Sequence, residues 1–326
     1  MMGQFRRIIG TGGIGVGTLW YMTDDRILGK NESRSAALTD AKDYCKQHII
    51  LHYLAQVLGG DTHVCAIGKV GDDVNGNRLL AEMNVAGIDT TCVEIDKSGV
   101  TMQSVCMHYP DKSVCNITTN NSVCQNVSPE YVCASLTKLP SLNEKTVMLA
   151  APEVPLVSRL ALLKAGKQAG TFNVASVLCD EAAAFSRNGG LELCDLLIIN
   201  EEEAVALAGS ASREALQSII DTNDLTIIVT LGKEGSFIVN RNGTYRRAAM
   251  PVTSAVSTAG AGDAFTAGVI CGLHFGLDLC NVSGGRTAVD VGHFLASFSV
   301  QCQHTIADNL TRKDILDFLQ LRDEVK

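Results

Sequence analysis

The sequence predicts an α/β fold of three layers, in which helices cover both faces of a doubly wound, mostly parallel sheet. Short apolar runs rich in β-branched residues recur along the chain, and each is bounded by Gly, Pro, Asn or Asp. Helical patterns lie between most of these runs. Near-continuous apolar strands are typical of a sheet that is buried on both faces and therefore parallel. The alternation of strands with helices favours the doubly wound arrangement.

The strand and helix patterns follow one another along most of the chain. The predicted strands are residues 6–10, 63–68, 146–151, 170–175, 195–200, 225–232 and 235–240. Helical patterns cover residues 36–58, 77–87, 157–170 and 212–222. A last amphipathic helix is predicted over residues 311–321, because apolar residues there recur at helical spacing behind a capping Thr.

Two segments depart from this alternation. Residues 98–125 contain two alternating strand patterns around a Tyr109–Lys112 turn, which predicts a hairpin. Residues 16–34 have no helical period. Together these segments are expected to form a small β-lid over one edge of the main sheet. No repeat, low-complexity tract or linker divides the chain, so we expect residues 1–326 to form a single domain.

Composition excludes several classes of protein. The chain has 27 Lys and Arg against 35 Asp and Glu, a net charge of −8, which argues against nucleic acid as a partner. No uncharged apolar run reaches the roughly 18 residues of a membrane helix, and no apolar signal segment follows the N-terminus. Most of the 12 cysteines lie in apolar runs without a C-x-x-C pair, as expected of reduced thiols. We therefore expect a cytoplasmic protein with a small-molecule partner.

A glycine-rich turn follows the first predicted strand. In α/β sheets ligands bind beyond the carboxyl ends of the strands. Gly10–Gly15 fits the G-x-G-x-x-G pattern of a dinucleotide-binding turn. That pattern needs a helix next and an acidic residue after a second strand, whereas VGTLWYMTDD follows and Glu32 does not end a strand. A dinucleotide-dependent oxidoreductase is thus an alternative that rests on this turn alone.

The most informative segment is residues 256–276. Gly260-Ala261-Gly262-Asp263 opens an apolar helix, so small residues and the helix dipole favour binding of an anion there. A carboxylate in that first turn has two interpretations. Asp263 is either a general base beside a phosphoryl group or an acid that only stabilises the helix dipole.

At this segment the sequence resembles the ribokinase (phosphofructokinase-B) family of sugar and nucleoside kinases. The family motif D-T-x-G-A-G-D-x-F is matched by residues 257–265, STAGAGDAF. The resemblance implies a ribokinase-like fold. It also implies that Asp263 is the catalytic base, and that the backbone of Gly260, Ala261 and Gly262 forms the anion hole.

Further motifs match in the family's order. Asn200-Glu201-Glu202-Glu203 resembles N-x-x-E, which implies that Asn200 and Glu203 hold magnesium through water. Residues 230–236, TLGKEGS, resemble the T-L-G-x-x-G nucleotide loop, with Thr230, Gly232 and Gly235 at the matched positions. Residues 67–73, IGKVGDD, resemble a structural G-x-x-G-D-D segment.

Each match also has a plainer interpretation. Asn200–Glu203 could be only a helix N-cap with acids in its first turn. The 230–236 loop could be only a hairpin turn. His293 aligns near the family's adenine pocket, although a core histidine is an equal alternative.

The acceptor end departs from the family. The family's opening G-x-x-N-x-D has Gly13 and Gly15 at its Asn and Asp positions, so the acceptor would meet backbone there. The family's G-G-x-x-x-N is replaced by Cys45–Ile50. Other groups, such as Asp43, Lys46 or His48, could therefore hold the acceptor.

Two acceptor-facing positions of the family are matched. Glu153 and Asn173 align with family residues that face the acceptor, and their alternatives are a solvated loop acid and a turn-capping Asn. Whether these two residues contact the acceptor stays open at this stage.

Three smaller expectations follow from the resemblance. The cation site of potassium-dependent members has Ser257 and Ala259 in place of an Asp and a Thr, so little potassium activation is expected. Lid residues such as Val105 and Met107 could pair across a homodimer. Lys112 could reach the phosphates or be an exposed turn lysine.

Taken together, the resemblance implies a kinase that uses ATP and Mg²⁺ to phosphorylate an alcohol of a sugar, polyol or nucleoside. Asp263 would take the proton of the attacking hydroxyl. A non-catalytic metabolite-binding protein on the kinase fold is the main alternative, because the family's hydroxyl-binding residues are missing at the acceptor end.

Overall fold

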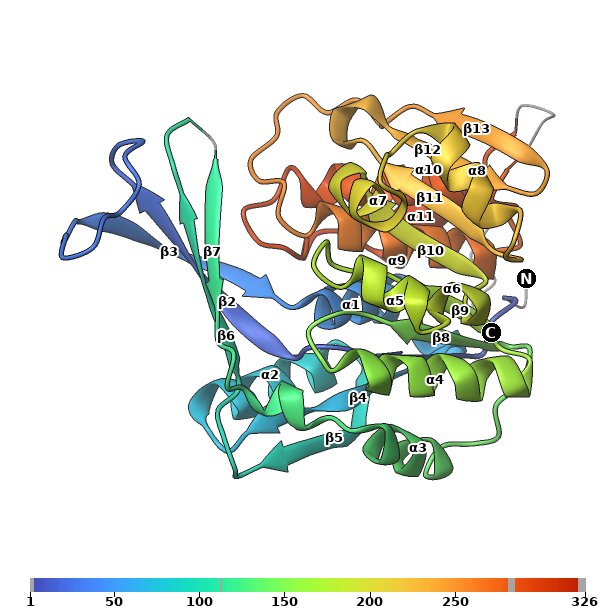
Figure 1. The fold of residues 1–326 in the computed structure, drawn as a ribbon, viewed down its shortest axis with the longest axis horizontal. Helices are drawn as coiled ribbons and strands as arrows, with labels where there is room; N and C mark the ends of the chain where they lie inside the picture. The colour runs from blue at the N-terminus through green and yellow to red at the C-terminus, as the bar shows by residue number, and fades with distance from the viewer. Residues whose placement is uncertain (1–2, 112, 281–284, 322–326) are drawn as a thin grey trace.

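Nine strands form the central sheet of the computed structural model, which describes residues 3–111, 113–280 and 285–321 (Figure 1). The strand order is β13-β12-β11-β10-β9-β8-β1-β4-β5. Pairing is parallel from β11 through β5, and β12 and β13 are antiparallel at one edge. The strands are β1 (Arg7–Thr11), β4 (His63–Gly71), β5 (Ile88–Asp96), β8 (Thr146–Ala150), β9 (Phe172–Ala175), β10 (Leu196–Asn200), β11 (Thr226–Thr230), β12 (Ser236–Asn240) and β13 (Gly243–Arg247). The mostly parallel α/β sheet is confirmed; β5 and β13 were not predicted.

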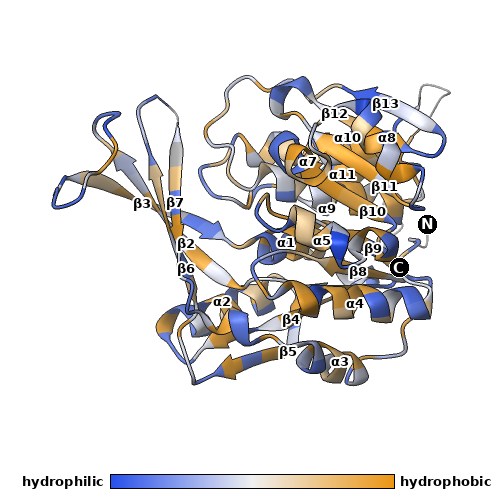
Figure 2. Ribbon diagram, in the orientation of Figure 1, coloured by the Kyte–Doolittle hydropathy of each residue, from blue (hydrophilic) through white to orange (hydrophobic). Residues whose placement is uncertain are grey.

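Helices cover both faces of this sheet, which gives the three expected layers. One face packs against α1 (Lys46–Leu58), α2 (Val74–Val85), α9 (Ala261–His274), α10 (Ala288–Ser299) and α11 (Arg312–Leu319). The other packs against α3 (Pro129–Thr137), α4 (Leu156–Ala169), α5 (Ala182–Arg187), α6 (Gly190–Leu193), α7 (Glu201–Ala208) and α8 (Arg213–Ile220). Neighbouring strand residues go to opposite layers, as Ile8 and Ile9 do. The apolar central strands appear as orange ribbons between the helices in Figure 2.

A second sheet stands apart from the main body at the left of Figure 1. Its strands are β2 (Gly15–Met22), β3 (Ala36–Tyr44), β6 (Met102–His108) and β7 (Val114–Thr118), in the order β3-β2-β6-β7. We call these four strands and their connecting loops the lid. The hairpin predicted within residues 98–125 is present as β6 and β7; its turn residue Lys112 lies outside the described residues.

One prediction about this region was wrong. The helical pattern over residues 36–58 is a lid strand, β3, followed by helix α1, which begins at Lys46. Pairing of β3 with β2 supplies hydrogen bonds that the sequence pattern does not reveal. The lid therefore includes residues 36–44, beyond the predicted 16–34 and 98–125 segments.

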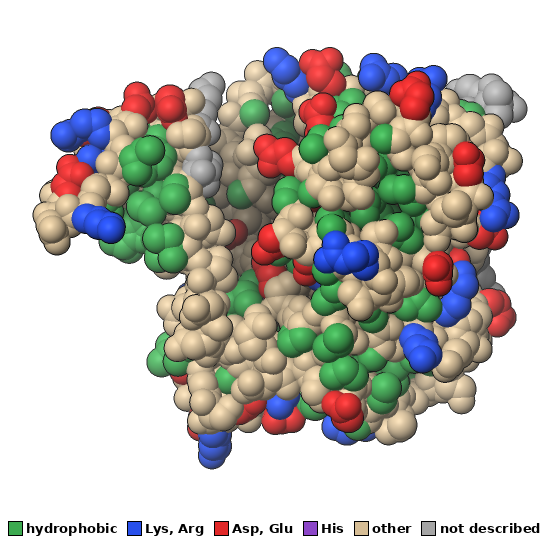
Figure 3. Space-filling view, in the orientation of Figure 1, with side chains coloured by type: hydrophobic (Ala, Val, Ile, Leu, Met, Phe, Trp, Pro, Cys, Tyr) green, Lys and Arg blue, Asp and Glu red, His purple; other side chains and the backbone are tan. Residues whose placement is uncertain are grey.

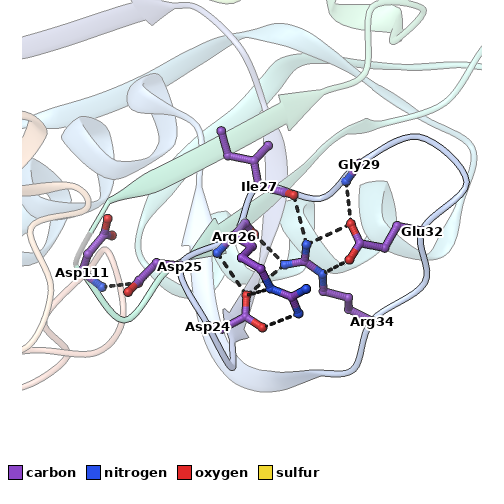
Figure 4. A network of polar contacts seen from close by, with 8 residues as sticks. All are labelled: Asp24, Asp25, Arg26, Ile27, Gly29, Glu32, Arg34 and Asp111. Carbon is purple, nitrogen blue, oxygen red and sulfur yellow. Dashed lines mark hydrogen bonds and ion pairs between the residues drawn. The ribbon is translucent and has the colours of Figure 1, made fainter.

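The loop between β2 and β3 is held by ionic contacts. The Arg34 guanidinium binds Asp24 and Glu32, and it also donates to two backbone carbonyls of the same loop (Figure 4). The pKa of Glu32 is lowered to about 2, chiefly by its hydrogen bond from Arg34. The Asp111 amide donates to Asp25 Oδ1 at 2.8 Å, which ties the two hairpins of the lid together. Glu32 is thus a structural residue of the lid.

Within the described part of the chain, no helix is both long and apolar enough to cross a membrane.

Candidate active site

The predicted functional segments converge beyond the carboxyl ends of the parallel strands. The 12–15 turn follows β1, Glu153 follows β8, Asn200 ends β10, and the 230–235 loop follows β11. The amino end of α9 and the first residues of α1 complete the group. Figure 3 shows the molecule hollowed between the lid and the main body, with acidic side chains along the main-body wall.

The amino end of α9 has the backbone of an anion site. Gly260 caps the helix with φ of 76°, and a Cβ there would lie 2.6 Å from the Thr305 carbonyl oxygen, so glycine is required. A Cβ at Gly262 would meet nothing within 4 Å, so the backbone at that position faces open space. The first amides of a helix lack partners within the helix and carry its positive dipole. This end of α9 can therefore hold a phosphoryl group.

Asp263 is the third residue of α9 and is 8% exposed. Lys46 Nζ, from the first residue of α1, lies 3.8 Å from its Oδ1. Burial raises the pKa of Asp263, and the charge of Lys46 opposes this rise. The pKa of Lys46 is raised in turn, first by Asp263 and further by Glu203 and Glu153. Lys46 is thus the ammonium that three carboxylates of the site share.

Lys46 is placed against the local preference of its helix. A positive charge in the first turn of a helix opposes the dipole, and α1 has no side-chain cap at Cys45. Such a departure from helix rules is expected at functional sites rather than in a purely structural helix. The carboxylates that surround Lys46 offset its unfavourable position.

Glu153 enters the site from the end of β8 in a strained backbone conformation. Its φ is 77°, in the left-handed region that non-glycine residues rarely adopt. Its Oε2 is buried without a hydrogen-bond partner among the described residues. Burial raises the pKa of Glu153 to about 7, although Lys46 lowers it. The strained backbone and the unpartnered Oε2 favour a functional role for Glu153 over that of a solvated loop acid.

Asn200 and Glu203 form a reciprocal capping box at the start of α7. The Asn200 amide donates to Glu203 Oε2 at 2.8 Å, and the Glu203 amide donates to Asn200 Oδ1 at 2.8 Å. Glu203 is 6% exposed, and burial raises its pKa. Among the described residues, no group of three or more His, Cys, Asp and Glu side chains is arranged to ligate a metal directly.

The predicted nucleotide loop is a tight turn between β11 and β12. Gly232 and Gly235 have φ of 55° and 92°, and a Cβ at Gly235 would overlap the Arg247 carbonyl oxygen. Thr230 Oγ1 donates to the Ile199 carbonyl at 3.4 Å, which joins the loop to β10. His293 is 6% exposed, and its Nε2 lies 2.9 Å from Ser236 Oγ. It lies behind the loop, where it fixes the first residue of β12.

Three predicted acceptor residues are not available to a ligand. Gly13 and Gly15 are buried. A side chain at Gly13 would meet Glu153 at 2.6 Å, and one at Gly15 would meet Met102 at 2.7 Å. These glycines therefore make room for neighbouring side chains rather than face the acceptor.

Asn173 is the third correction. It lies in the first half of β9, away from the carboxyl end, and is fully buried. Its amide nitrogen donates to the carbonyls of Leu163 and Leu193, and Thr171 donates to its Oδ1. With both side-chain atoms bonded inside the protein, Asn173 is structural.

Of the three replacement candidates, the structure brings Asp43 and Lys46 to the site but not His48. Both ring nitrogens of His48 are buried without partners, and its ring packs on Tyr44 at a centroid distance of 4.3 Å. Asp43 is close enough to Asp263 for their charges to interact. Residues before Tyr44 alternate weakly between apolar and polar, as in a strand, which could have placed Asp43 in the lid. The helical pattern assigned to residues 36–58 concealed this alternation.

The dinucleotide interpretation of the glycine turn fails. Gly12–Gly15 leads from β1 directly into lid strand β2, and no helix follows. A dinucleotide fingerprint needs a helix amino end at this place to bind the pyrophosphate.

Comparison with known proteins agrees with this geometry. The profile described as pfkB family carbohydrate kinase matches residues 50–312. This chain belongs to the pfkB family of carbohydrate kinases. It is accordingly a phosphotransferase of the ribokinase-like fold, in the class that acts on small sugars and nucleosides.

The individual relatives described next are less than 30% identical to this chain. A ribokinase of Staphylococcus aureus is 26% identical over 249 residues, which cover 72% of this chain and 75% of that protein. An ATP-dependent ribose-1-phosphate kinase of Halopiger xanaduensis is 28% identical over 248 residues, covering 72% and 77%. The structure of a ribokinase from Giardia lamblia superposes with a TM-score of 0.80 at 19% identity, covering 96% of this chain and 99% of the other, which shows a shared fold.

Proposed function

We propose that this pfkB-family kinase transfers the γ-phosphoryl group of ATP to an alcohol of a sugar, polyol or nucleoside, with Asp263 as the general base. The observation that carries the proposal is the amino end of α9. There the open backbone at Gly262 adjoins the buried carboxylate of Asp263, next to the ammonium of Lys46.

The reaction needs a base, an anion hole and a way to balance phosphate charge. Asp263 accepts the proton of the attacking hydroxyl. The amides of Gly262 and Asp263, in the first turn of α9, hold the oxygens of the transferring phosphoryl group, while the Ala261 amide donates to the Thr258 carbonyl at 3.3 Å. The Lys46 charge opposes the rise that burial causes in the Asp263 pKa and so favours the ionised form that accepts a proton.

The nucleotide side of the site uses the remaining motifs. Thr230, Gly232 and Gly235 shape the loop on which the nucleotide lies, and His293 supports it from behind. Asn200 and Glu203 would hold a magnesium ion through water, and the bound ion would supply positive charge to balance that of the phosphates. Closure of the lid over the hollow would exclude water and so limit hydrolysis of ATP.

A release assay for ADP tests this function. The panel contains ribose, fructose, xylitol, glycerol and adenosine, with ribose 1-phosphate and ribose 5-phosphate as charged members; ATP, Mg²⁺ and a blank without acceptor complete it. We expect ADP formation that depends on one class of acceptor. If ATP binds but no acceptor raises ADP release above the blank, a non-catalytic metabolite-binding protein is favoured instead.

We also infer a homodimer through the lid. Leu38, Val105 and Ile117 lie on one face of the lid sheet and are 60%, 39% and 61% exposed. Register places Met107 on the same face as Val105. Exposed apolar patches of this kind favour association, and a second copy's lid has the same character. Sedimentation of Ile117→Lys beside the native chain tests it: the substitution should shift the mass toward a monomer.

A further inference from the structure

The lid carries a carboxylate that the nucleotide half of the site does not use. Asp43 lies in the last paired residues of β3, opposite Gly17 of β2, and Gly17 lies opposite Ser104 of β6. A Cβ at Gly17 would overlap Asp43 Oδ2. The Asp43 carboxylate therefore extends across β2 in the space that Gly17 leaves free.

This carboxylate lies near the amino end of α9, because the carbonyl of the preceding Lys42 accepts a hydrogen bond from the Thr305 amide at 3.0 Å and Thr305 packs against Gly260. Burial raises the pKa of Asp43 to about 6, and the negative charge of Asp263 adds to the rise. Within the described residues Asp43 forms no ion pair, and its Oδ2 accepts a long hydrogen bond, 3.7 Å, from Cys106 Sγ. A largely buried carboxylate is costly unless other groups bind it. A ligand that donates hydrogen bonds would supply what the protein does not.

Polar groups surround Asp43 on the same face of the lid. Ser104 lies beside Gly17, and Cys106 Sγ lies 3.5 Å from Asn116 Oδ1. The opposite face carries the exposed apolar side chains of Val105 and Ile117. The lid sheet is therefore polar toward the hollow and apolar on its outer face.

We propose that Asp43 binds vicinal hydroxyl groups of an uncharged acceptor and so determines which alcohols the enzyme accepts. The inference rests on the proposed function and specifies its acceptor. An ionised carboxylate has two acceptor oxygens and can take a hydrogen bond from each of two neighbouring hydroxyls. Asp43 would replace, from the next strand, a carboxylate that Gly15 cannot provide.

The charges around the site favour a neutral acceptor. Glu153, Glu203 and Asp263 share one ammonium, that of Lys46, whereas Asp43 has no ion pair among the described residues, and ATP brings further negative charge. The buried, unpartnered Oε2 of Glu153 is a second acceptor atom for a hydroxyl. A phosphate on the acceptor would add repulsion without a described cation to receive it on the polar lid face formed by Ser104, Cys106 and Asn116.

Acceptor kinetics of Asp43→Asn test the proposal. Loss of a charged hydrogen-bond partner should raise KM for the best uncharged acceptor of the panel about 10–100-fold. KM for ATP should change less than about twofold, because Asp43 does not contact the nucleotide loop. Gly17→Ala, which displaces the Asp43 carboxylate, should act in the same direction. The matched control is Asp111→Asn, a fully exposed aspartate at the lid tip, which should leave both constants unchanged.

A comparison on deoxy acceptors distinguishes hydroxyl binding by Asp43 from a purely structural role of this residue. The native enzyme and Asp43→Asn are compared on the best acceptor and on analogues that each lack one hydroxyl. For at least one analogue the variant should lose less than about threefold, because the hydroxyl that Asp43 binds is already absent. An equal loss on every analogue would overturn the proposal.

The negative charge around the site predicts a preference for uncharged over phosphorylated acceptors. The native enzyme should use ribose or another uncharged member of the panel with a kcat/KM at least about 10-fold above that for ribose 1-phosphate. A preference for the phosphorylated sugar would overturn the inference while leaving the kinase function intact. Absence of acceptor-dependent ADP release with every member would instead refute the kinase function on which the inference rests.

Discussion

The nucleotide side of the site comes from short continuous segments, whereas the acceptor side is assembled from residues far apart in the chain. Asn200–Glu203, Thr230–Gly235 and Gly260–Asp263 each act through backbone turns and one or two side chains. Asp43, Lys46 and Glu153 come from a lid strand, a helix start and a strained loop. If the proposed roles hold, phosphate binding is fixed by backbone shape, while acceptor choice depends on which side chains the lid brings over the site.

The largest expected effect comes from the residue where the two sides meet. Asp263→Asn keeps the volume of the side chain but cannot accept the hydroxyl proton, so kcat should fall about 10²–10⁴-fold. ATP affinity should hold or rise slightly, because a negative charge near the γ-phosphate is removed. Steady-state kinetics with an ATP-binding titration check both.

The control for this variant is another acid in the first turn of a helix. Asp314 lies in the capping box of α11, far along the chain from the site. Asp314→Asn should lower stability and leave kcat unchanged. Near-native turnover of Asp263→Asn would reduce Asp263 to the same helix-stabilising role.

Lys46→Gln tests whether the Lys46 ammonium, on the acceptor side, controls the protonation of Asp263. Lys46 lowers the pKa of Asp263 against the effect of burial, so its removal should raise that pKa further. The acidic limb of kcat/KM should then move to higher pH, with a loss of about 10-fold at pH 7 and less at pH 9. Lys164→Gln, on the exposed side of α4, is the matched control and should leave the profile unchanged.

Glu153→Gln should separate activity from stability on the acceptor side. The pKa of Glu153 is about 7 in the folded protein and near 4.5 when unfolded. The folded state therefore holds the proton more tightly, and its stability declines as pH rises from about 4.5 through about 7. The substitution should raise the free energy of unfolding by about 1–3 kcal/mol at pH 8 and by little at pH 4.

Glu153→Gln should weaken acceptor binding even though it stabilises the protein at pH 8. If Glu153 holds an acceptor hydroxyl, KM for the acceptor should rise while the protein becomes more stable at pH 8. Denaturant unfolding at the two pH values measures the stability. A variant that is less stable at pH 8 than the native chain would contradict the account of Glu153 as a buried, unpartnered acid.

The smallest expected effect concerns monovalent cations. Ser257 and Ala259 stand where the resemblance places a carboxylate and a hydroxyl for potassium, and Ser257 Oγ accepts a hydrogen bond from the Ala259 amide at 3.2 Å. Rates in potassium and in tetramethylammonium should differ less than about twofold. Severalfold stimulation by potassium would show that other groups rebuild the cation site.

The sequence was sufficient for most of the sheet and for the turns that carry the family motifs, because the relevant signals are local. The predicted strands at 63–68 and 195–200 lie in β4 and β10, and Gly260 opens helix α9 as expected, while the anion-binding role of this turn stays a prediction. Such a turn can be recognised in the sequence because one short continuous segment forms all of it.

The acceptor side could not be predicted in the same way. Its geometry depends on pairing between β2 and β3, which sets Asp43 over Gly17, and the sequence pattern of β3 resembles a helix. The expectation for Asn173 failed because a polar residue near a strand end can point into the core and bond there. Placement at the end of a strand therefore predicted the position of Glu153 beyond β8, and its contact with the acceptor stays a prediction, whereas Asn173 lies within β9 and is bonded in the core.

The identity of the product tests the central claim most directly. The native enzyme is incubated with Mg²⁺, ATP and its best acceptor from the panel, and phosphorus NMR follows the reaction. A single new phosphomonoester should appear in an amount equal to the ADP formed, and Asp263→Asn should form it at least about 100-fold more slowly while still binding ATP. Inorganic phosphate as the only new product, or an equal rate with Asp263→Asn, would contradict transfer to an alcohol by this base.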